Sequence, residues 1–144
     1  MFKEKLPLNC EYSKIGLFNF LNSEIGNPFE NKLFEINGNS EKGNEDKLAN
    51  IITSKYYISG SWVSKDEMNS YIKIDFKRYQ FRFKAISFES GKYGKNCIGS
   101  FAIEGLNPND SWITIHSFDN KNCYTQLLAA MDDFPKESYR YIRI

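Results

Sequence analysis

The sequence predicts an all-β protein, an antiparallel β-sandwich with one or two short helices. Aromatic residues make up 16% of its 144 residues, and such side chains suit the pleated, half-buried surface of a sheet. Short segments of alternating apolar and polar residues recur along the second half of the chain, with turn-forming residues between them. Several short strands separated by turns are typical of a sandwich or a barrel.

The clearest strand is expected at residues 71–76. Ile72, Ile74 and Phe76 fall on one face, whereas Lys73 and Asp75 fall on the other, which is the pattern of a half-buried strand. The remaining strands are expected at residues 33–36, 81–88, 100–105, 112–116 and 139–144.

The segments between the strands are less regular. Residues 12–22 have apolar side chains near helical spacing, with Ser13 as a possible cap, and predict a short helix. Residues 37–50 predict a polar loop, and residues 107–110, Asn-Pro-Asn-Asp, predict a turn. Residues 126–131 predict a loop or a second short helix.

The overall charge and composition argue against several classes of partner. The net charge is +1, which gives no electrostatic reason to expect binding to nucleic acid or to an anionic membrane. No apolar run approaches the ~18 residues that would insert across a bilayer. The N-terminal residues lack the apolar stretch of about 7–15 residues found in a secretory signal. We therefore expect a cytoplasmic protein.

No residue pattern predicts catalysis, a metal or a cofactor. His116 is the only histidine, and as a strand-end residue it is expected at the surface or at a sheet edge. Cys10, Cys97 and Cys123 lack the close spacing of a metal site, so we expect free thiols in a reducing compartment. The acids outside the predicted strands are expected to be solvated; they are Glu24, Glu30, Glu45, Asp46, Asp66, Glu67, Asp132 and Asp133.

Polar and aromatic residues within the strands are interpreted as structural. Asp75 is expected to accept hydrogen bonds from a neighbouring loop or to pair with Arg82 or Lys84. Trp112 and Phe101 lie on facing strands of a predicted hairpin and are expected in the core.

The order of these segments resembles that of discoidin-like domains (F5/8 type C, galactose-binding-like). The resemblance depends on residues 72–77 (IKIDFK), 101–107 (FAIEGLN), 111–115 (SWITI) and 139–144 (YRYIRI). Residues 16–21 and 36–40 are similar to the opening of an intracellular protist branch, in which the module often follows a BTB domain. The resemblance covers residues 12–144, leaves residues 1–11 as an N-terminal segment, and implies a jelly-roll-like sandwich.

The chain departs from the family pattern at several positions. Leu106 stands where Ser is usual, Pro108-Asn109-Asp110 replaces an Asp-Gly turn, and Tyr71 stands where Trp is common. The family usually adds a loop and one more strand beyond the position of Ile144.

The missing last strand predicts an open sheet edge. Unpaired backbone groups at such an edge are a template for another chain, and Tyr139, Tyr141 and Arg143 are the candidate interface residues. Arg140 and Arg143 fall on opposite faces. The alternative, slightly favoured, is that the sequence is part of a longer protein.

A second candidate site is the loop at residues 53–69, because relatives bind ligands through loops at one end of the sandwich. Tyr56, Tyr57, Trp62 and Lys65 lie in it, and exposed aromatic rings stack on sugars or anchor protein partners. The alternative is that Tyr57 and Trp62 cover the end of the core. Residues 91–96 form a further, basic loop.

Two functional hypotheses remain. The first is a non-catalytic intracellular module that binds a protein partner or belongs to a larger assembly, such as a cytoskeletal one. The alternative is a glycan-binding, lectin-like module that uses its end loops. The fold alone does not decide between them.

Overall fold

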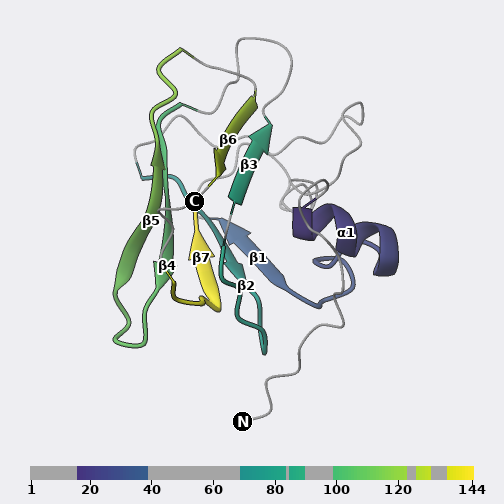
Figure 1. Ribbon diagram of the computed structural model, residues 1–144. Helices are drawn as coiled ribbons and strands as arrows, with labels where there is room; N and C mark the ends of the chain where they lie inside the picture. Colours follow the sequence, from purple (N-terminus) through teal and green to yellow (C-terminus); the bar gives the residue numbers. More distant parts are fainter. Residues whose placement is uncertain (1–15, 39–68, 84, 90–98, 123–125, 131–135) are drawn as a thin grey trace. The chain divides into compact units, whose positions relative to one another are not determined.

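Figure 1 shows the computed structural model of the protein. The structure describes residues 16–38, 69–83, 85–89, 99–122, 126–130 and 136–144. The chain divides into two compact units, Met1–Tyr79 and Gln80–Ile144, and each is described by itself. The predicted division into residues 1–11 and 12–144 stays a prediction.

The first unit begins with helix α1, Gly16–Ile25, which confirms the predicted helix but places its end later in the chain. The helix ends where Gly26 takes a φ of 83°, the left-handed conformation that glycine adopts without a steric penalty. Asn31 Nδ2 then donates to the carbonyl of Ile25 at 3.1 Å, which satisfies one of the acceptors left open at a helix end. The Asn27 side chain accepts a hydrogen bond from the amide of Phe29 at 3.0 Å.

Strands β1, Glu35–Gly38, and β2, Ile72–Asp75, pair in antiparallel orientation, with Ile36 opposite Ile74. The predicted burial of Ile72, Ile74 and Phe76 is confirmed, but Asp75 on the opposite face is buried as well. An aromatic cluster forms the core of this unit. Phe34 meets Phe76 edge to face at 5.1 Å between ring centroids, and Phe18 stacks on Phe76 at 6.4 Å.

The second unit contains a hairpin of β4, Phe101–Leu106, and β5, Trp112–Phe118 (Figure 1). The predicted turn between them is confirmed. The side chain of Asn107 accepts hydrogen bonds from the amides of Asn109 (3.0 Å) and Ser111 (2.9 Å), and Asp110 takes a φ of 58°, a conformation that Asp tolerates. The pairing of β4 with β5 shifts register between Ile103 and Glu104.

Strand β7, Tyr141–Arg143, pairs with the other side of β4. It is shorter than the strand predicted at residues 139–144, because Tyr139 makes an isolated bridge to Phe81 instead. Within this unit β4 therefore lies between β5 and β7.

The last pair consists of β3, Ala85–Glu89, and β6, Gln126–Ala130, in antiparallel orientation. The loop or helix predicted at residues 126–131 is wrong for residues 126–130, which form a strand. Phe88 on β3 packs edge to face against Phe101 (4.9 Å) and Phe118 (5.8 Å). Phe101 thus joins an aromatic cluster, as expected, although its side chain is only half-buried.

In the part of the chain that the structure describes, no helix combines the length and the apolar character needed to cross a membrane.

Candidate functional site

A row of polar side chains crosses β5, β4 and β7 on one face. Glu104 on β4 lies directly opposite Thr114 on β5 and opposite Arg143 on β7. Residues opposite one another in antiparallel strands point to the same side of the sheet. Their strand neighbours Ile103 and Ile142 are buried, so the row points away from the core of this unit. We call Trp112, Thr114, Glu104 and Arg143 the sheet-face cluster.

Arg143 is held from two directions within this cluster. Its Nε donates a hydrogen bond to Oε2 of Glu104 in a close ion pair. Its guanidinium carbon also lies 4.5 Å from the centroid of the Trp112 ring, a distance at which the cation is attracted to the ring face. The side chains of Arg143 and Glu104 remain 31% and 26% exposed. The core position expected for Trp112 is therefore wrong: its half-buried ring lies under Arg143 on the outward face.

Tyr139 lies in a different setting from the free edge that was expected. Its amide donates to the carbonyl of Phe81 at 2.9 Å, and its carbonyl accepts from the amide of Phe81 at 3.0 Å. Its side chain is buried, 4% exposed. Burial raises the pKa of the phenol, and the negative charge of Glu137 raises that pKa further. Tyr139 therefore does not offer unpaired backbone groups to another chain, which corrects the open-edge expectation at this residue.

Tyr141 and Arg143 lie on β7, which is paired with β4 on one side. Tyr141 is half-buried, and the guanidinium of Arg140 lies 4.6 Å from its ring centroid. An interface that uses Tyr141 and Arg143 stays a prediction.

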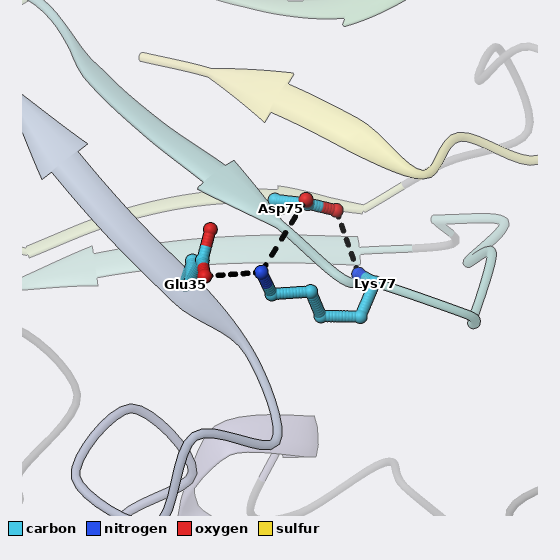
Figure 2. Close-up of polar contacts among 3 residues, drawn as sticks. All are labelled: Glu35, Asp75 and Lys77. Carbon is cyan, nitrogen blue, oxygen red and sulfur yellow. Dashed lines mark hydrogen bonds and ion pairs between the residues drawn. The ribbon is translucent and has the colours of Figure 1, made fainter.

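A second polar cluster joins β1 to the residues that follow β2 (Figure 2). Nζ of Lys77 forms a close ion pair with Glu35 and lies 4.0 Å from Oδ2 of Asp75. The amide of Lys77 also donates to Oδ1 of Asp75 at 2.7 Å, and Lys77 takes a φ of 59°. The expected structural role of Asp75, as an acceptor for a neighbouring turn, is confirmed. Lys77 is one cationic neighbour of Asp75. The expected pairing with Arg82 or Lys84 stays a prediction, and Lys84 lies outside the described residues.

The residues considered for catalysis or metal binding do not converge in the described part of the chain. His116 is half-buried, and its ring lies 4.7 Å from that of Phe118. Glu24 and Glu30 are exposed. Among the described residues, no group of three or more His, Cys, Asp or Glu side chains has the arrangement of a metal site. The remaining candidate acids and all three cysteines lie outside the described residues.

The predicted binding loop also lies outside the described residues. Tyr56, Tyr57, Trp62 and Lys65 belong to the segment between β1 and β2 in the chain. Their role as a ligand site therefore rests on the sequence, as does that of the basic loop at residues 91–96.

Comparison with solved structures identifies the architecture. A family 32 carbohydrate-binding module from Clostridium perfringens NanJ, in complex with galactose, superimposes with a TM-score of 0.59 at 14% identity, covering 78% of this chain and 80% of that one. A second Clostridium perfringens module, in complex with GalNAc-β-1,3-galactose, gives a TM-score of 0.60 at 11% identity, covering 78% and 82%. The chain has the fold of family 32 carbohydrate-binding modules.

A third structure agrees with this assignment of the fold. The C-terminal domain of a chitobiase from Bacteroides fragilis gives a TM-score of 0.53 at 20% identity, covering 77% of this chain and 78% of that one. No family model and no curated protein match the chain. The predicted antiparallel β-sandwich of galactose-binding-like type is thus confirmed. The finer resemblance to a BTB-associated protist branch receives no support.

The sheet-face cluster was missed from the sequence. Arg143 was considered only as an edge residue, Trp112 only as a core residue, and Glu104 only as part of a motif. The alternation of residues 101–106 and 139–144 places Glu104 and Arg143 on the faces opposite Ile103 and Ile142. That they lie side by side depends on a strand register that joins positions 39 residues apart.

Proposed function

We propose that this protein is a non-catalytic carbohydrate-binding module. The observation that carries the proposal is the fold, shared over about three quarters of the chain with modules solved in complex with galactose or GalNAc-β-1,3-galactose. Carbohydrate-binding modules hold sugars without performing chemistry on them, in keeping with the scattered acids and the lone histidine of this chain. The proposed ligands are sugars of the galactose and N-acetylgalactosamine type.

The sequence offers suitable side chains for such a ligand. Tyr56, Tyr57 and Trp62 have rings that stack on the apolar C–H face of a pyranose, and Lys65 is a hydrogen-bond donor for hydroxyls. The fold of these carbohydrate-binding modules supports the glycan-binding hypothesis over the protein-interaction hypothesis. The cytoplasmic location predicted from the sequence stays a prediction.

Glycan-array screening of the full chain, followed by calorimetry with galactose and GalNAc-β-1,3-galactose, tests the proposal. We expect saturable binding to at least one galactose-containing glycan. Trp62→Ala should weaken that binding about tenfold, because the lost contact with apolar surface is worth about 25 cal/mol per Å² and about 1.4 kcal/mol is a tenfold change in affinity. Lys121→Gln is the matched control, since Lys121 is an exposed side chain paired with Asp119 at 3.4 Å. Absence of binding across the array would overturn the proposal.

A further inference from the structure

The sheet-face cluster has the composition of a sugar-binding surface, and it is made of residues other than those of the predicted end loop at residues 53–69. A hydroxyl (Thr114), a carboxylate (Glu104) and a guanidinium (Arg143) lie in register on three neighbouring strands. The strands are β5, β4 and β7 (Figure 1). Adjacent strands are about 4.8 Å apart, so the row spans roughly the width of a pyranose ring with its hydroxyl groups.

The guanidinium in this row is oriented before any ligand arrives. Glu104 fixes its Nε, and the Trp112 ring supports its planar face at 4.5 Å. In the part of the chain that the structure describes, the two terminal nitrogens of Arg143 have no hydrogen-bond partner. A guanidinium already held in place loses little side-chain entropy when it binds, and this favours affinity.

The charges in the cluster indicate which kind of ligand fits. The negative charge of Glu104 offsets the positive charge of Arg143 at close range, so an anion gains little from this surface. A sugar hydroxyl both donates and accepts hydrogen bonds. It therefore matches a surface that presents N–H donors on Arg143, carboxylate acceptors on Glu104 and a hydroxyl on Thr114.

The aromatic ring supplies the apolar part of the surface. Trp112 is half-buried, and because Arg143 lies over its ring, a ligand can contact only the part of the indole that the guanidinium leaves uncovered. Trp is among the residues that dominate binding surfaces, because a large apolar area is combined with one N–H donor.

We propose that the sheet-face cluster is a second sugar-binding subsite that takes a neutral hexopyranose through a pair of vicinal hydroxyls. Arg143 donates to one hydroxyl and Glu104 accepts from its neighbour, while the indole of Trp112 supports the guanidinium and contacts the sugar only beside it. This subsite rests on the proposed function but does not require the loop at residues 53–69.

NMR titration of the full chain, labelled with ¹⁵N, tests the subsite directly. Galactose, N-acetylgalactosamine and glucuronic acid are added separately, and the indole Nε1–H of Trp112 and the Nε–H of Arg143 are followed. We expect saturable shifts of both signals with a neutral sugar, and the same shifts in the Trp62→Ala variant. Shifts confined to Trp62 and the end loop would overturn the second subsite but leave the proposed function standing. No shift anywhere would overturn both, and stronger binding of glucuronic acid would overturn the neutral ligand class.

Substitutions in the Trp62→Ala background separate binding from a merely structural ion pair. Arg143→Lys keeps the positive charge but loses the several N–H donors and the flat guanidinium that stacks on Trp112. It should lower the affinity for the neutral sugar about tenfold. Thr114→Val is nearly isosteric at an exposed strand position, so it should lower the affinity for the sugar without altering the fold. Lys121→Gln should leave the affinity unchanged. Equal affinity in the parent, Arg143→Lys and Thr114→Val proteins would show that the cluster only joins strands.

Discussion

The ring of Tyr139 lies directly against the backbone of Gly105. A Cβ placed on Gly105 would be 2.2 Å from Cδ1 and 2.5 Å from Cε1 of that ring, far inside van der Waals contact. Gly105 lies in β4, between the two strands that flank it. The missing side chain at Gly105 is therefore what allows the buried Tyr139 to pack across this strand.

Gly105→Ala should consequently destabilise the protein. The tyrosine ring is buried, and its backbone is bonded to Phe81 in both directions, so it has little room to retreat. Overpacking of this kind costs about 1–3 kcal/mol. Urea denaturation followed by circular dichroism measures the change. Gly99→Ala is the matched control, because a Cβ at Gly99 meets nothing within 4 Å; equal stability of the two variants would contradict the packing described for Tyr139.

Gly26→Ala should also destabilise the protein, for a different physical reason. A Cβ at Gly26 meets nothing within 4 Å, but the residue has a φ of 83°. A non-glycine residue in the left-handed region costs about 1–2 kcal/mol, and here that conformation ends α1. Gly26→Asn should cost less, since Asn visits this region more readily. The same denaturation experiment ranks the variants, and an alanine as stable as the asparagine would argue against a backbone effect.

The parts of the fold that could be predicted are those in which the residue pattern within a single strand is enough to indicate its buried face. Ile72, Ile74 and Phe76 alternate with polar residues, and the buried face follows from that period alone. The burial of Asp75, which is 8% exposed, could not be predicted, because alternation shows that a face is polar but not that it is covered.

Strand β6 and the sheet-face cluster depend on pairing between distant segments. Residues 126–130, Gln-Leu-Leu-Ala-Ala, are good helix formers without alternation, and they become a strand through pairing with β3. Such context outweighs intrinsic preference in sheets. In the same way, Glu104 meets Arg143 only through the register of β4 with β7, which neither segment encodes by itself.

Asp75→Ala should weaken the first unit more than Glu35→Ala does. Asp75 is nearly buried and accepts the amide hydrogen of Lys77 at 2.7 Å. Removing the Asp75 carboxylate leaves the amide N–H of Lys77 without this acceptor, at a cost of about 1–3 kcal/mol. Glu35 has a side chain that is 61% exposed, and surface ion pairs contribute at most about 1 kcal/mol.

Urea denaturation of both variants, in low and in high salt, measures the difference. Asp75→Asn keeps an oxygen that can accept from the Lys77 amide and should recover much of the lost stability. High salt should reduce the loss of stability caused by Glu35→Ala, because salt screens exposed ion pairs. A larger loss for Glu35→Ala than for Asp75→Ala would show that the ion pair, and not the turn, is the stabilising element of the cluster in Figure 2.

Stability should fall at alkaline pH because of Tyr139. Its folded-state pKa is raised above the ordinary tyrosine value of 10.0, first by burial and then by the charge of Glu137. Above pH 10.0 the unfolded chain therefore releases the phenolic proton while the folded chain retains it, and proton release favours the unfolded state. The contribution of protonated Tyr139 to the stability of the folded state is fully present below pH 10.0. It is lost as the pH rises through the folded-state pKa. The chain has nine tyrosines, so variants of Tyr139 are needed to isolate its share of the pH dependence.

Tyr139→Phe removes the ionisable group and keeps the ring against Gly105. Urea midpoints at about pH 8 and about pH 11 should differ more in the parent protein than in this variant. Glu137→Gln should fall between the two, because it removes the smaller of the two causes of the raised pKa. The same pH dependence in the parent and in Tyr139→Phe would mean that Tyr139 ionises as readily in the folded protein as in the unfolded chain, against the burial that the structure shows.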